Sequence, residues 1–599
     1  MCGIVAYSGK QNCAGLIIEG LKKLEYRGYD SAGISLEKDN KIITLKAIGR
    51  VDNLEKLVKQ EKGQCFCAIG HTRWATHGKP CEQNSHPHND CKNLISIVHN
   101  GIIENYASLK QELQAKGHIF KSQTDSEVIA HLIEEKLKTL DFTRAFCQTI
   151  KQVKGAYAIA ALYSKEPGKI MAAKNQSPLV LGIAKDGTFL ASDVPAFLEY
   201  TNKAVFLEDG DVAQIEGTSY QIFNTDLDEQ ARKVNSINWD VATAQKGGYS
   251  HFMLKEIFEQ PRSAQDTLRT LKGNFEQAFG ITKEEAKKIK GIYLVACGTA
   301  YHASLCAKYM LEDFAQIPVE VETASEFKYR KIAFCKDWLF IAVSQSGETA
   351  DTIAAIKNAK AAGLKIMSIC NVLGSTITRL SDTTLYTHCG PEISVASTKA
   401  FTSQLAVLYS FALNLALTLG RISQKEFDEL YLSLEKLPKL MQQVLLQEEK
   451  IKKIAKVMHT KEDFIFLGRN ASYPIALEGA LKLKEISYLH AEGFAAGEIK
   501  HGPIAVIEEG TPVLALVSKG RLEEKMLSNC QEVKARGAKV IVVSDDEDIS
   551  EAIQIPFEKE FLFPILSAIV LQFFAYYIAV FRGRDVDRPR NLAKSVTVE

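Results

Sequence analysis

The sequence predicts an α/β protein in which a β-rich N-terminal domain precedes two doubly wound α/β domains. Short β-rich runs separated by turn residues fill the first 220 or so residues. Beyond residue 290, apolar strands alternate with helices, as in parallel sheets that are covered on both faces. This pattern then occurs a second time: residues 292–298 resemble 464–468, 338–344 match 513–518, and Lys360 recurs as Lys534. The recurrence indicates a duplicated domain.

Residues 2–217 are expected to form the N-terminal domain. Glycine, asparagine and aspartate turn signals separate its β-rich runs. Two amphipathic helices are expected because apolar residues recur at three- and four-residue spacing, and Asp125 stands where a side chain could cap the second helix. The expected strands cover residues 3–8, 42–48, 94–99, 157–163, 189–192 and 211–216, and the expected helices cover 12–24 and 126–138.

The remaining residues divide where the pattern changes. Residues 224–248 are polar and lack periodicity, which is typical of a connector between domains. A helical stretch at 424–459 separates the two repeats. We therefore expect a linker with leading helices at 218–282, a first α/β domain at 283–423, connecting helices at 424–453, a second α/β domain at 454–589 and a tail at 590–599.

Composition and charge limit the function. With 599 residues, of which 46% are hydrophobic and 24% charged, the chain has the make-up of an ordinary globular protein of several domains. Its net charge of +1 gives no overall attraction to nucleic acid or to an anionic membrane, so neither is expected as a partner. Thirteen scattered cysteines indicate reduced thiols, and the N-terminus has no secretion signal. We therefore expect a cytoplasmic protein.

One segment allows another interpretation. Residues 561–581 carry no charge, and their length alone is sufficient for a membrane span. Pro564, Ser567, Gln572 and two tyrosines dilute the hydrophobicity of this segment. Their presence favours a helix that is buried in the core or in a subunit interface.

Cys2 is the first candidate catalytic residue. Removal of Met1 would make it the N-terminal residue. Its α-amino group, whose pKa is ordinarily about 8, would then be a built-in base beside the thiol. A cysteine at this position is usually incidental, so the prediction depends on other polar groups in the same domain.

Such groups occur in three clusters, at residues 71–78, 99–105 and 124–127. Arg73 could bind a carboxylate through parallel N–H groups, and Asp125 could hold an ammonium group. Asn100 and the Gly101 N–H could face a developing oxyanion. Together with Met-Cys-Gly-Ile at the start and Tyr-Arg-Gly-Tyr-Asp-Ser at 26–31, the clusters resemble the glutaminase domain of the N-terminal-nucleophile amidotransferases. The resemblance covers about residues 2–217 and implies a four-layer αββα fold.

Four residues in the same domain offer a competing interpretation. Cys81, His86, His88 and Cys91 lie close together in the sequence and could indicate zinc. Their spacing, C-x4-H-x-H-x2-C, is not one of the common zinc patterns. We therefore expect no metal site.

A phosphate site is expected in the first repeat. The run Ser-Gln-Ser-Gly-Glu-Thr at 344–349 leads from a strand into a helix. Hydroxyls and N–H groups gathered at a helix N-terminus suit phosphate without any lysine or arginine. Thr299 and Ser397 supply further hydroxyls, and the arrangement resembles the sugar isomerase (SIS) fold, which binds phosphosugars. The second repeat has Ser-Lys-Gly-Arg at 518–521 instead, so we expect it to have lost phosphate binding.

The whole chain resembles the glucosamine-6-phosphate synthase family. The resemblance rests on the N-terminal cysteine domain, the two SIS-like repeats and the final residues Asn-Leu-Ala-Lys-Ser-Val-Thr-Val-Glu at 591–599. It implies conversion of fructose-6-phosphate and L-glutamine to glucosamine-6-phosphate and L-glutamate, the first step toward UDP-N-acetylglucosamine. It also implies a homodimer held by the SIS domains and a reaction without a cofactor.

The same resemblance implies a role for each candidate residue. Cys2 attacks the glutamine amide, and Asn100 and Gly101 form the oxyanion hole. Glutamine binds to Arg73, Trp74, Thr76, His77 and Asp125, and Trp74 gates an internal ammonia channel. His501 opens the sugar ring, Lys594 forms a Schiff base at C2, and Glu485 moves a proton between C1 and C2. The sugar phosphate binds to Thr299, Ser344, Gln345, Ser346, Thr349, Val395, Ser397 and Lys482.

One departure from the family and three alternatives are visible. Ala300 stands where the family often has a serine that contacts the sugar, which puts one hydrogen bond in doubt. A phosphoribosyl-transferring amidotransferase would need a phosphate loop that residues 542–550 lack, and asparagine synthesis would need an ATP site that is not found in the sequence. A non-catalytic SIS-type sugar-phosphate sensor would have lost Cys2 and Lys594, and both are present.

Overall fold

The chain divides into two compact units, which are described separately. The computed structural model describes residues 2–25, 30–73, 81–237, 246, 248–271 and 275–597. The first unit comprises Met1–Val241 together with Ala593–Glu599, and the second comprises Ala242–Leu592.

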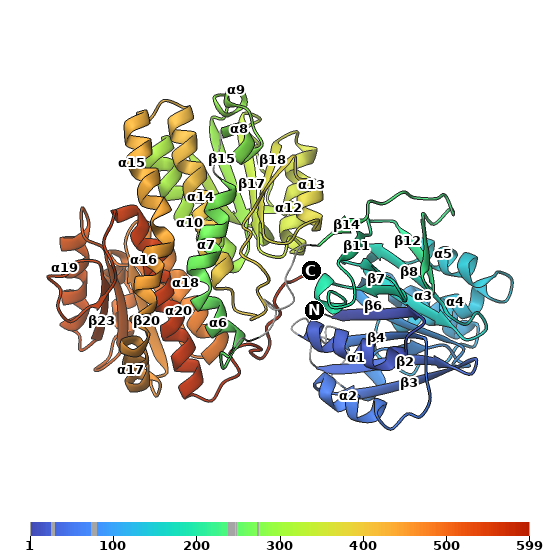
Figure 1. The fold of residues 1–599 in the computed structure, drawn as a ribbon. Helices are drawn as coiled ribbons and strands as arrows, with labels where there is room; N and C mark the ends of the chain where they lie inside the picture. The colour runs from blue at the N-terminus through green and yellow to red at the C-terminus, as the bar shows by residue number, and fades with distance from the viewer. Residues whose placement is uncertain are drawn as a thin grey trace. The chain divides into compact units, whose positions relative to one another are not determined.

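Two antiparallel sheets form the centre of the first unit (Figure 1). An eight-stranded sheet has the order β14-β11-β9-β10-β1-β4-β2-β3, and a six-stranded sheet has the order β13-β12-β8-β7-β6-β5. The strands are β1 (Gly3–Gly9), β2 (Ser31–Lys38), β3 (Lys41–Ile48), β4 (Cys67–Arg73), β5 (His88–Asn89), β6 (Ile95–Ile103), β7 (Gly155–Tyr163), β8 (Lys169–Asn175), β9 (Val180–Ala184), β10 (Gly187–Ala191), β11 (Lys203–Phe206), β12 (Val212–Glu216), β13 (Ser219–Phe223) and β14 (Asn235–Ser236).

Helices cover the outer face of each sheet. α1 (Cys13–Leu24) and α2 (Val51–Val58) share an apolar core with the eight-stranded sheet. α3 (Tyr106–Ala115), α4 (Glu127–Lys136) and α5 (Phe142–Gln152) share another with the six-stranded sheet. A third apolar cluster, which includes Ile4, Ile69, Val98 and Ala160, lies between the two sheets. The central strands are buried on both faces for this reason, and the predicted four-layer αββα fold is confirmed.

Two details of the first unit differ from the sequence-based expectations. Asp125 does not cap α4, because its carboxylate accepts the backbone N–H of Ile103 at 2.7 Å and Ser126 occupies the N-cap position. β13 and β14 extend the two sheets beyond residue 217, into a segment for which the sequence predicts a linker. Pairing with a neighbouring strand orders these short segments although they have little apolar periodicity of their own.

The second unit contains two parallel five-stranded sheets with the same topology. Their orders are β16-β15-β17-β18-β19 and β21-β20-β22-β23-β24. In each sheet the chain leaves the first strand toward one side and returns on the other, so a topological switch point lies between the first and third strands. The strands are β15 (Gly291–Ala296), β16 (Val319–Thr323), β17 (Trp338–Ser344), β18 (Lys365–Cys370), β19 (Thr383–Tyr386), β20 (Asp463–Gly468), β21 (His490–Ala495), β22 (Pro512–Val517), β23 (Lys539–Ser544) and β24 (Ile553–Gln554).

The repeated strand order confirms the two doubly wound domains that the sequence predicts. Helices precede, connect and cover the two sheets. They are α6 (Phe252–Phe258), α7 (Gln260–Thr270), α8 (Phe275–Phe279), α9 (Lys283–Ala286), α10 (Gly298–Met310), α11 (Ala324–Phe327), α12 (Ala350–Ala361), α13 (Thr376–Leu380), α14 (Lys399–Thr418), α15 (Gln424–Glu435), α16 (Leu437–Leu445), α17 (Glu448–Met458), α18 (Ser472–Ser487), α19 (Glu523–Lys534) and α20 (Phe563–Phe581).

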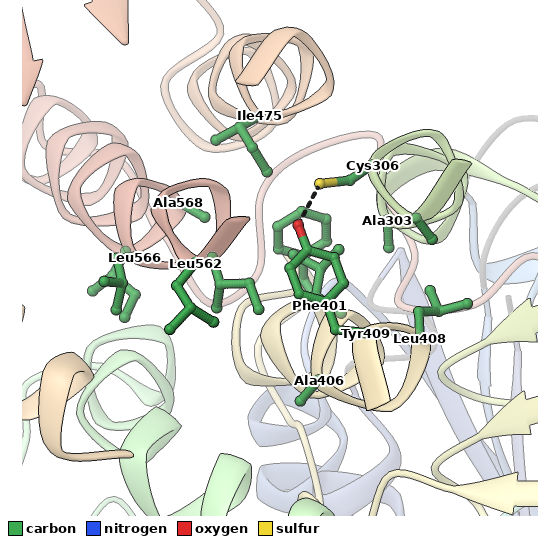
Figure 2. Close-up of a cluster of buried hydrophobic side chains, with 14 of the residues drawn as sticks. Ala303, Cys306, Phe401, Ala406, Leu408, Tyr409, Ile475, Leu562, Leu566 and Ala568 are labelled. Carbon is green, nitrogen blue, oxygen red and sulfur yellow. Dashed lines mark hydrogen bonds between the residues drawn. The ribbon is translucent and has the colours of Figure 1, made fainter. Parts of the chain in front are cut away.

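Two helices of the second unit are long and apolar enough to span a membrane. They comprise Lys399–Thr418 and Glu560–Phe581, and 89% and 94% of their most apolar windows are buried within the protein. Figure 2 shows α10, α14, α18 and α20 meeting in one apolar cluster, in which the Sγ of Cys306 lies 3.1 Å from the hydroxyl of Tyr409. Packing inside one chain therefore accounts for their composition. Of the two positions that the sequence favours for α20, the core and a subunit interface, the structure supports the core.

Polar groups on α20 also have partners within the second unit. Tyr576 lies 2.8 Å from Nδ1 of His251, and the hydroxyl of Tyr577 donates to Glu448. Gln572 donates to the carbonyl of Thr398 at 3.4 Å. These contacts are those of a core helix, because a buried polar group is stable only where it is hydrogen-bonded.

Candidate active sites

Asn100 connects the candidate nucleophile to the centre of the first unit. It stands on β6, and its Nδ2 donates to the carbonyl of Cys2 at 3.0 Å and to the hydroxyl of Ser192 at 2.8 Å. The same hydroxyl accepts the N–H of Ile4 at 2.9 Å. The amide that the sequence assigns to an oxyanion hole thus holds the backbone around Cys2.

The orientation of the Asn100 amide is fixed by His71. Nε2 of His71 lies 3.0 Å from the Oδ1 of Asn100 and 3.0 Å from the carbonyl of His99. Both of these atoms are acceptors, so Nε2 must carry the hydrogen. Burial lowers the pKa of His71 to about 3, which keeps the ring neutral in ordinary buffers. With Oδ1 bound to His71, the Nδ2 of Asn100 is left to face Cys2.

Gly101 follows Asn100 on β6 and pairs with Tyr157 of β7. Its φ is +129°, and a Cβ at this position would lie 1.9 Å from the carbonyl oxygen of Ala156. Only glycine combines this backbone conformation with so close an approach. The sequence of the strand therefore allows β6 and β7 to pair beside the predicted oxyanion site.

Arg73 and Asp125, the two charged residues predicted to bind glutamine, lie close enough to interact electrostatically. Arg73 ends β4 and is buried. Burial lowers its pKa, and the neighbouring Cys2, Asp30 and Asp125 act in the opposite direction. Asp125 is also buried, and its hydrogen bond to the N–H of Ile103 ties it to β6. The folded first unit thus brings Cys2, Arg73, Asn100 and Asp125 together.

Three other predicted glutamine-binding residues, Trp74, Thr76 and His77, lie outside the described residues. Their roles remain predictions.

Two further histidines, His86 and His88, pack next to His71 of β4. The rings of His71 and His86 stack at 4.1 Å, and those of His86 and His88 lie edge to face at 4.4 Å. Burial lowers the pKa of both His86 and His88 well below the usual range, and it also lowers that of His99. A neutral histidine layer therefore supports the site without adding positive charge next to Arg73.

The predicted phosphate site lies at the carboxyl end of β17. Gly347 N–H donates to the hydroxyl of Ser344 at 3.0 Å, and Glu348 N–H donates to the hydroxyl of Ser346 at 3.2 Å. The hydroxyls of Ser344 and Thr349 lie 3.4 Å apart. This turn leads into α12, so hydroxyls and backbone N–H groups gather at a helix N-terminus, as an anion site requires.

The turn is held in shape by its neighbours. Gly347 has a φ of +64°, and a Cβ there would lie 1.9 Å from the hydroxyl of Ser375. Glu348 accepts the N–H of Thr376 at 2.7 Å, which ties the turn to the start of α13. Gln345 contributes its carbonyl to the N–H of Asn371 at 3.2 Å. These contacts fix the backbone around the hydroxyls.

The equivalent turn of the second repeat is occupied by carboxylates. Asp545 accepts the N–H of Lys519 at 2.6 Å, and Glu523 accepts the N–H of Gly520 at 3.2 Å. Two glutamates begin the following helix, α19. Because these groups are acidic, they repel the anion that the first repeat is shaped to receive.

Thr299 joins the two repeats of the second unit. It follows β15, which borders the switch point, and lies in the first turn of α10. Its hydroxyl donates to Oε1 of Glu478 at 3.0 Å and accepts from Nζ of Lys482 at 3.0 Å. His302, one turn further along α10, lies 2.7 Å from Oε2 of Glu478. A polar network thus crosses from the first repeat to α18 of the second.

Lys482 is the centre of this network. It is buried, lies 3.4 Å from Glu478, and pairs with Glu485 one turn further along α18. Burial alone would lower its pKa, but the two carboxylates outweigh that effect and raise it to about 12. Burial raises the pKa of Glu478, whereas Lys482 and His302 lower it by more. The predicted base, Glu485, is therefore held beside a permanent cation.

The remaining predicted sugar-site residues are placed less directly. The N–H of Val395 donates to the carbonyl of Asp587 at 3.1 Å, and Ser397 lies half-buried two residues further on. The side chain of His501 is exposed and has no hydrogen bond, ion pair or ring partner among the described residues. Lys594 belongs to the first unit, whereas Glu485 belongs to the second. The roles of these four residues remain predictions.

Four residues that position the sites were not predicted from the sequence. His71 and Ser192 orient Asn100, and His302 and Glu478 surround Lys482. The spacing E-x3-K-x2-E along α18 could have revealed Glu478, because residues three and four apart lie on one helix face. No local pattern marks Ser192, which is 92 positions from Asn100.

Comparisons with known proteins identify the domains in which the two candidate sites lie. A glutamine amidotransferase domain model matches residues 71–199, and a SIS domain model matches residues 286–414 and 458–582. The C-terminal domain of the glucosamine-fructose-6-phosphate aminotransferase from Francisella tularensis covers 58% of this chain and 100% of its own at 41% identity, with a TM-score of 0.56.

Relatives match along the whole length. The chain is 46% identical to the glutamine–fructose-6-phosphate aminotransferase (isomerizing) of Clostridium acetobutylicum and 48% identical to that of Thermococcus kodakarensis, with 100% of both chains covered in each case. The chain belongs to the family of isomerizing glutamine–fructose-6-phosphate aminotransferases.

Proposed function

We propose that the chain converts fructose-6-phosphate and L-glutamine to glucosamine-6-phosphate and L-glutamate. The observation that supports this most directly is the presence in one chain of two different sites. One is an N-terminal thiol beside buried Arg73, Asn100 and Asp125, and the other is a hydroxyl-lined turn at the switch point of a parallel sheet. The first suits amide cleavage and the second suits a sugar phosphate.

In the first site, Cys2 forms a bond to the side-chain carbonyl carbon of glutamine. The α-amino group of Cys2 takes the thiol proton and passes it to the leaving nitrogen as the C–N bond breaks. This step releases ammonia and leaves a thioester, which water hydrolyses to glutamate. Arg73 binds the α-carboxylate and Asp125 the α-ammonium group of glutamine. Asn100 and Gly101 stabilise the negative oxygen of the intermediate. Met1 must be removed for this mechanism, and intact mass measurement of active protein would reveal a retained Met1.

In the second site, the phosphate of the sugar binds at residues 344–349 and Lys594 forms a Schiff base at C2. Forming that Schiff base expels the ketone oxygen as water, and ammonia from the first site then displaces Nζ of Lys594 to give an iminium at C2. The positive iminium makes the C1 hydrogen acidic, so Glu485 can remove it and return a proton at C2. His501 opens the sugar ring. The proposed reaction needs no cofactor, and we place it in the cytoplasm, in a homodimer.

Formation of glucosamine-6-phosphate from the two substrates tests the proposal, with Cys2→Ala and Lys594→Ala measured in parallel. We expect Cys2→Ala to lose glutamate release and Lys594→Ala to lose sugar conversion while it still binds fructose-6-phosphate. If folded wild-type protein binds the sugar phosphate but forms no product, the chain is a sugar-phosphate sensor and the proposal is wrong.

A further inference from the structure

A group of metal-ligand side chains lies in the first unit, outside the residues assigned to either site. Cys91 follows β5, His118 follows α3, and His131 and Glu134 stand on α4. One potential ligand atom from each of these residues lies within 4.8 Å of the other three. The two histidines are buried, and the other two residues are half-buried. Three separate segments of the chain thus bring two imidazoles, one thiol and one carboxylate to a single point.

Four of the six distances between the ligand atoms lie within about 0.4 Å of those in a tetrahedral metal centre. Sγ of Cys91 lies 3.7 Å from Nδ1 of His118 and 3.6 Å from Nδ1 of His131. Oε2 of Glu134 lies 3.0 and 3.3 Å from the same two nitrogens. Zinc bonds of about 2.3 Å to sulfur and about 2.1 Å to nitrogen or oxygen place S and N about 3.6 Å apart, and N and O about 3.4 Å apart. We propose that Cys91, His118, His131 and Glu134 form a tetrahedral zinc site.

Hydrogen bonds alone account for this cluster poorly. Each Nδ1 carries at most one hydrogen, yet each lies near both the sulfur of Cys91 and the carboxylate of Glu134. A single cation bound by all four atoms satisfies every group at once. A thiolate, a carboxylate and two neutral imidazoles also balance the charge of Zn²⁺.

The surroundings of the cluster support the same assignment. Nε2 of His118 lies 3.0 Å from Oε2 of Glu135, and Nε2 of His131 lies 3.6 Å from Oε1 of Glu127. A carboxylate hydrogen-bonded to the outer nitrogen is the usual arrangement around metal-bound histidine, and at His118 it orients the ring and leaves Nδ1 as the ligand. At His131 the carboxylate lies at ion-pair distance, beyond the reach of a hydrogen bond. The backbone N–H of Ile119 also donates to Sγ of Cys91 at 3.5 Å.

Four protein ligands would fill the tetrahedral coordination of the zinc ion and leave no position for water or substrate. The metal therefore has a structural role. It links the turn after β5, the segment between α3 and α4, and α4 itself. Asp125 lies in the chain between His118 and His131. The zinc would therefore fix the segment that carries Asp125, a consequence that rests on the proposed function, although the metal site itself does not.

The spacing C-x26-H-x12-H-x2-E explains why inspection of the sequence does not reveal the site. The competing set Cys81, His86, His88 and Cys91 does not come together among the described residues. His86 accepts the N–H of His99, and His88 faces the hydroxyl of Thr124. Only Cys91 of that set belongs to the metal-ligand cluster.

Metal content of the purified full-length chain tests the proposal. Cys2 could also bind zinc, so Cys2→Ala serves as the background. After incubation with zinc and gel filtration, we expect about one zinc per chain in Cys2→Ala and a loss of at least tenfold in occupancy in Cys2→Ala/Cys91→Ser. Cys2→Ala/Cys335→Ser removes an exposed thiol of the second unit and should keep its zinc.

Cobalt provides a second readout. Co²⁺ bound by Cys91 should give tetrahedral visible bands with a thiolate charge-transfer band that Cys91→Ser abolishes. Zinc should also raise the thermal midpoint of Cys2→Ala but not that of Cys2→Ala/Cys91→Ser. If circular dichroism shows that Cys91→Ser does not fold, Glu134→Gln takes its place in the test, because glutamine has the same size as glutamate. We expect Glu134→Gln to weaken zinc binding at least tenfold.

Three results would overturn the proposal. They are no zinc bound by Cys2→Ala after incubation, equal zinc in Cys2→Ala and Cys2→Ala/Cys91→Ser, and unchanged zinc affinity in a folded Glu134→Gln. None of them depends on whether the enzyme forms glucosamine-6-phosphate, so the metal site and the proposed function are tested separately.

Discussion

The position of one hydrogen atom on His71 fixes the orientation of Asn100, a residue of the proposed glutaminase site. The neutral Nε2–H form of His71 holds the oxygen of Asn100, so the nitrogen of that amide faces Cys2. The roles of Arg73 and Asn100 can be predicted from the sequence because both residues stand in short, recognisable motifs. The role of His71 could not be predicted, since it depends on burial and on acceptors contributed by β6. The cap assigned to Asp125 is wrong for the same kind of reason: its carboxylate has a tertiary partner in Ile103.

We expect His71→Leu to lower the kcat of glutamate release about 10–100-fold, because the Asn100 amide can then rotate away. KM for glutamine should change little, since His71 is a positioning residue. His71→Gln can still donate one hydrogen bond and should restore part of the rate. Steady-state kinetics of glutamate release measures both, and equal loss in the two variants would contradict the proposed orientation.

Gly101→Ala should abolish glutamate release and destabilise the first unit by about 3 kcal/mol or more. The added Cβ would meet the backbone oxygen of Ala156, which cannot move without separating β6 from β7. Gly210→Ala is the matched control, because Gly210 has a φ of +92° and nothing within 4 Å of an added Cβ. Its cost should be only about 1 kcal/mol of conformational strain. Urea unfolding compares the two, and similar losses would show that the close approach is unimportant.

Two elements of the second unit, a turn and a helix face, carry the residues proposed for the sugar chemistry. The turn at 344–349 could be predicted from the sequence because strand, hydroxyl residues and helix follow one another directly. The face of α18 was predicted only in part. Glu485 and Lys482 came from a resemblance, whereas Glu478 becomes significant through Thr299 of the other repeat.

Lys482→Met should destabilise the second unit by about 3–5 kcal/mol, because it leaves Glu478 buried without its cation. Lys482→Met/Glu478→Gln removes the charge as well and should recover most of that stability, although sugar conversion should stay impaired in both. Urea unfolding and product formation measure the two effects. If the double variant is as unstable as the single variant, the buried ion pair is not the cause.

Ser344→Ala should raise the Kd for fructose-6-phosphate about tenfold, since one hydroxyl of the turn is lost. Ser518→Ala changes the corresponding residue of the second repeat, where Asp545 already occupies the N–H of Lys519, and should leave binding unchanged. Calorimetric titration with the sugar phosphate distinguishes them. A comparable effect of Ser518→Ala would show that the second repeat also binds the phosphate.

At the scale of the whole molecule, acid should weaken the first unit well before its carboxylates are protonated. His71 stays neutral when folded, with a pKa of about 3, but binds a proton after unfolding below about pH 6.5. The unfolded state therefore gains protons as the pH falls, and the free energy of unfolding decreases between pH 6.5 and 3 by about 1.4 kcal/mol per pH unit for each such histidine.

Hydrogen-exchange mass spectrometry on peptides of β4 and β6 at pH 7.5 and 5.5 measures this loss locally. His71→Asn lacks one of the titrating groups. Its free energy of opening should therefore fall less steeply as the pH is lowered, by the equivalent of about one bound proton. A slope that is equal in the two proteins would contradict a neutral His71 in the folded state.

The order of the domains was more predictable than the contacts between their parts. Strand and helix periodicity and the repeat are local or regular properties of the sequence, so the fold class follows from them. The cluster of Cys91, His118, His131 and Glu134 depends on three segments meeting in space. The burial of α20 likewise depends on which helices surround it, so its composition alone left a membrane span open.

The contact of Thr299 with Glu478 and Lys482 has a consequence for how this chain can change over generations. The two repeats began as copies, but one keeps the anion turn and the other supplies the carboxylates and the lysine. Each half retains only part of the groups that the proposed sugar site uses, so we expect that neither half would act alone. Substitutions at position 299 should therefore be accepted only together with compensating changes at 478 or 482, and the gene should resist fission between its two halves.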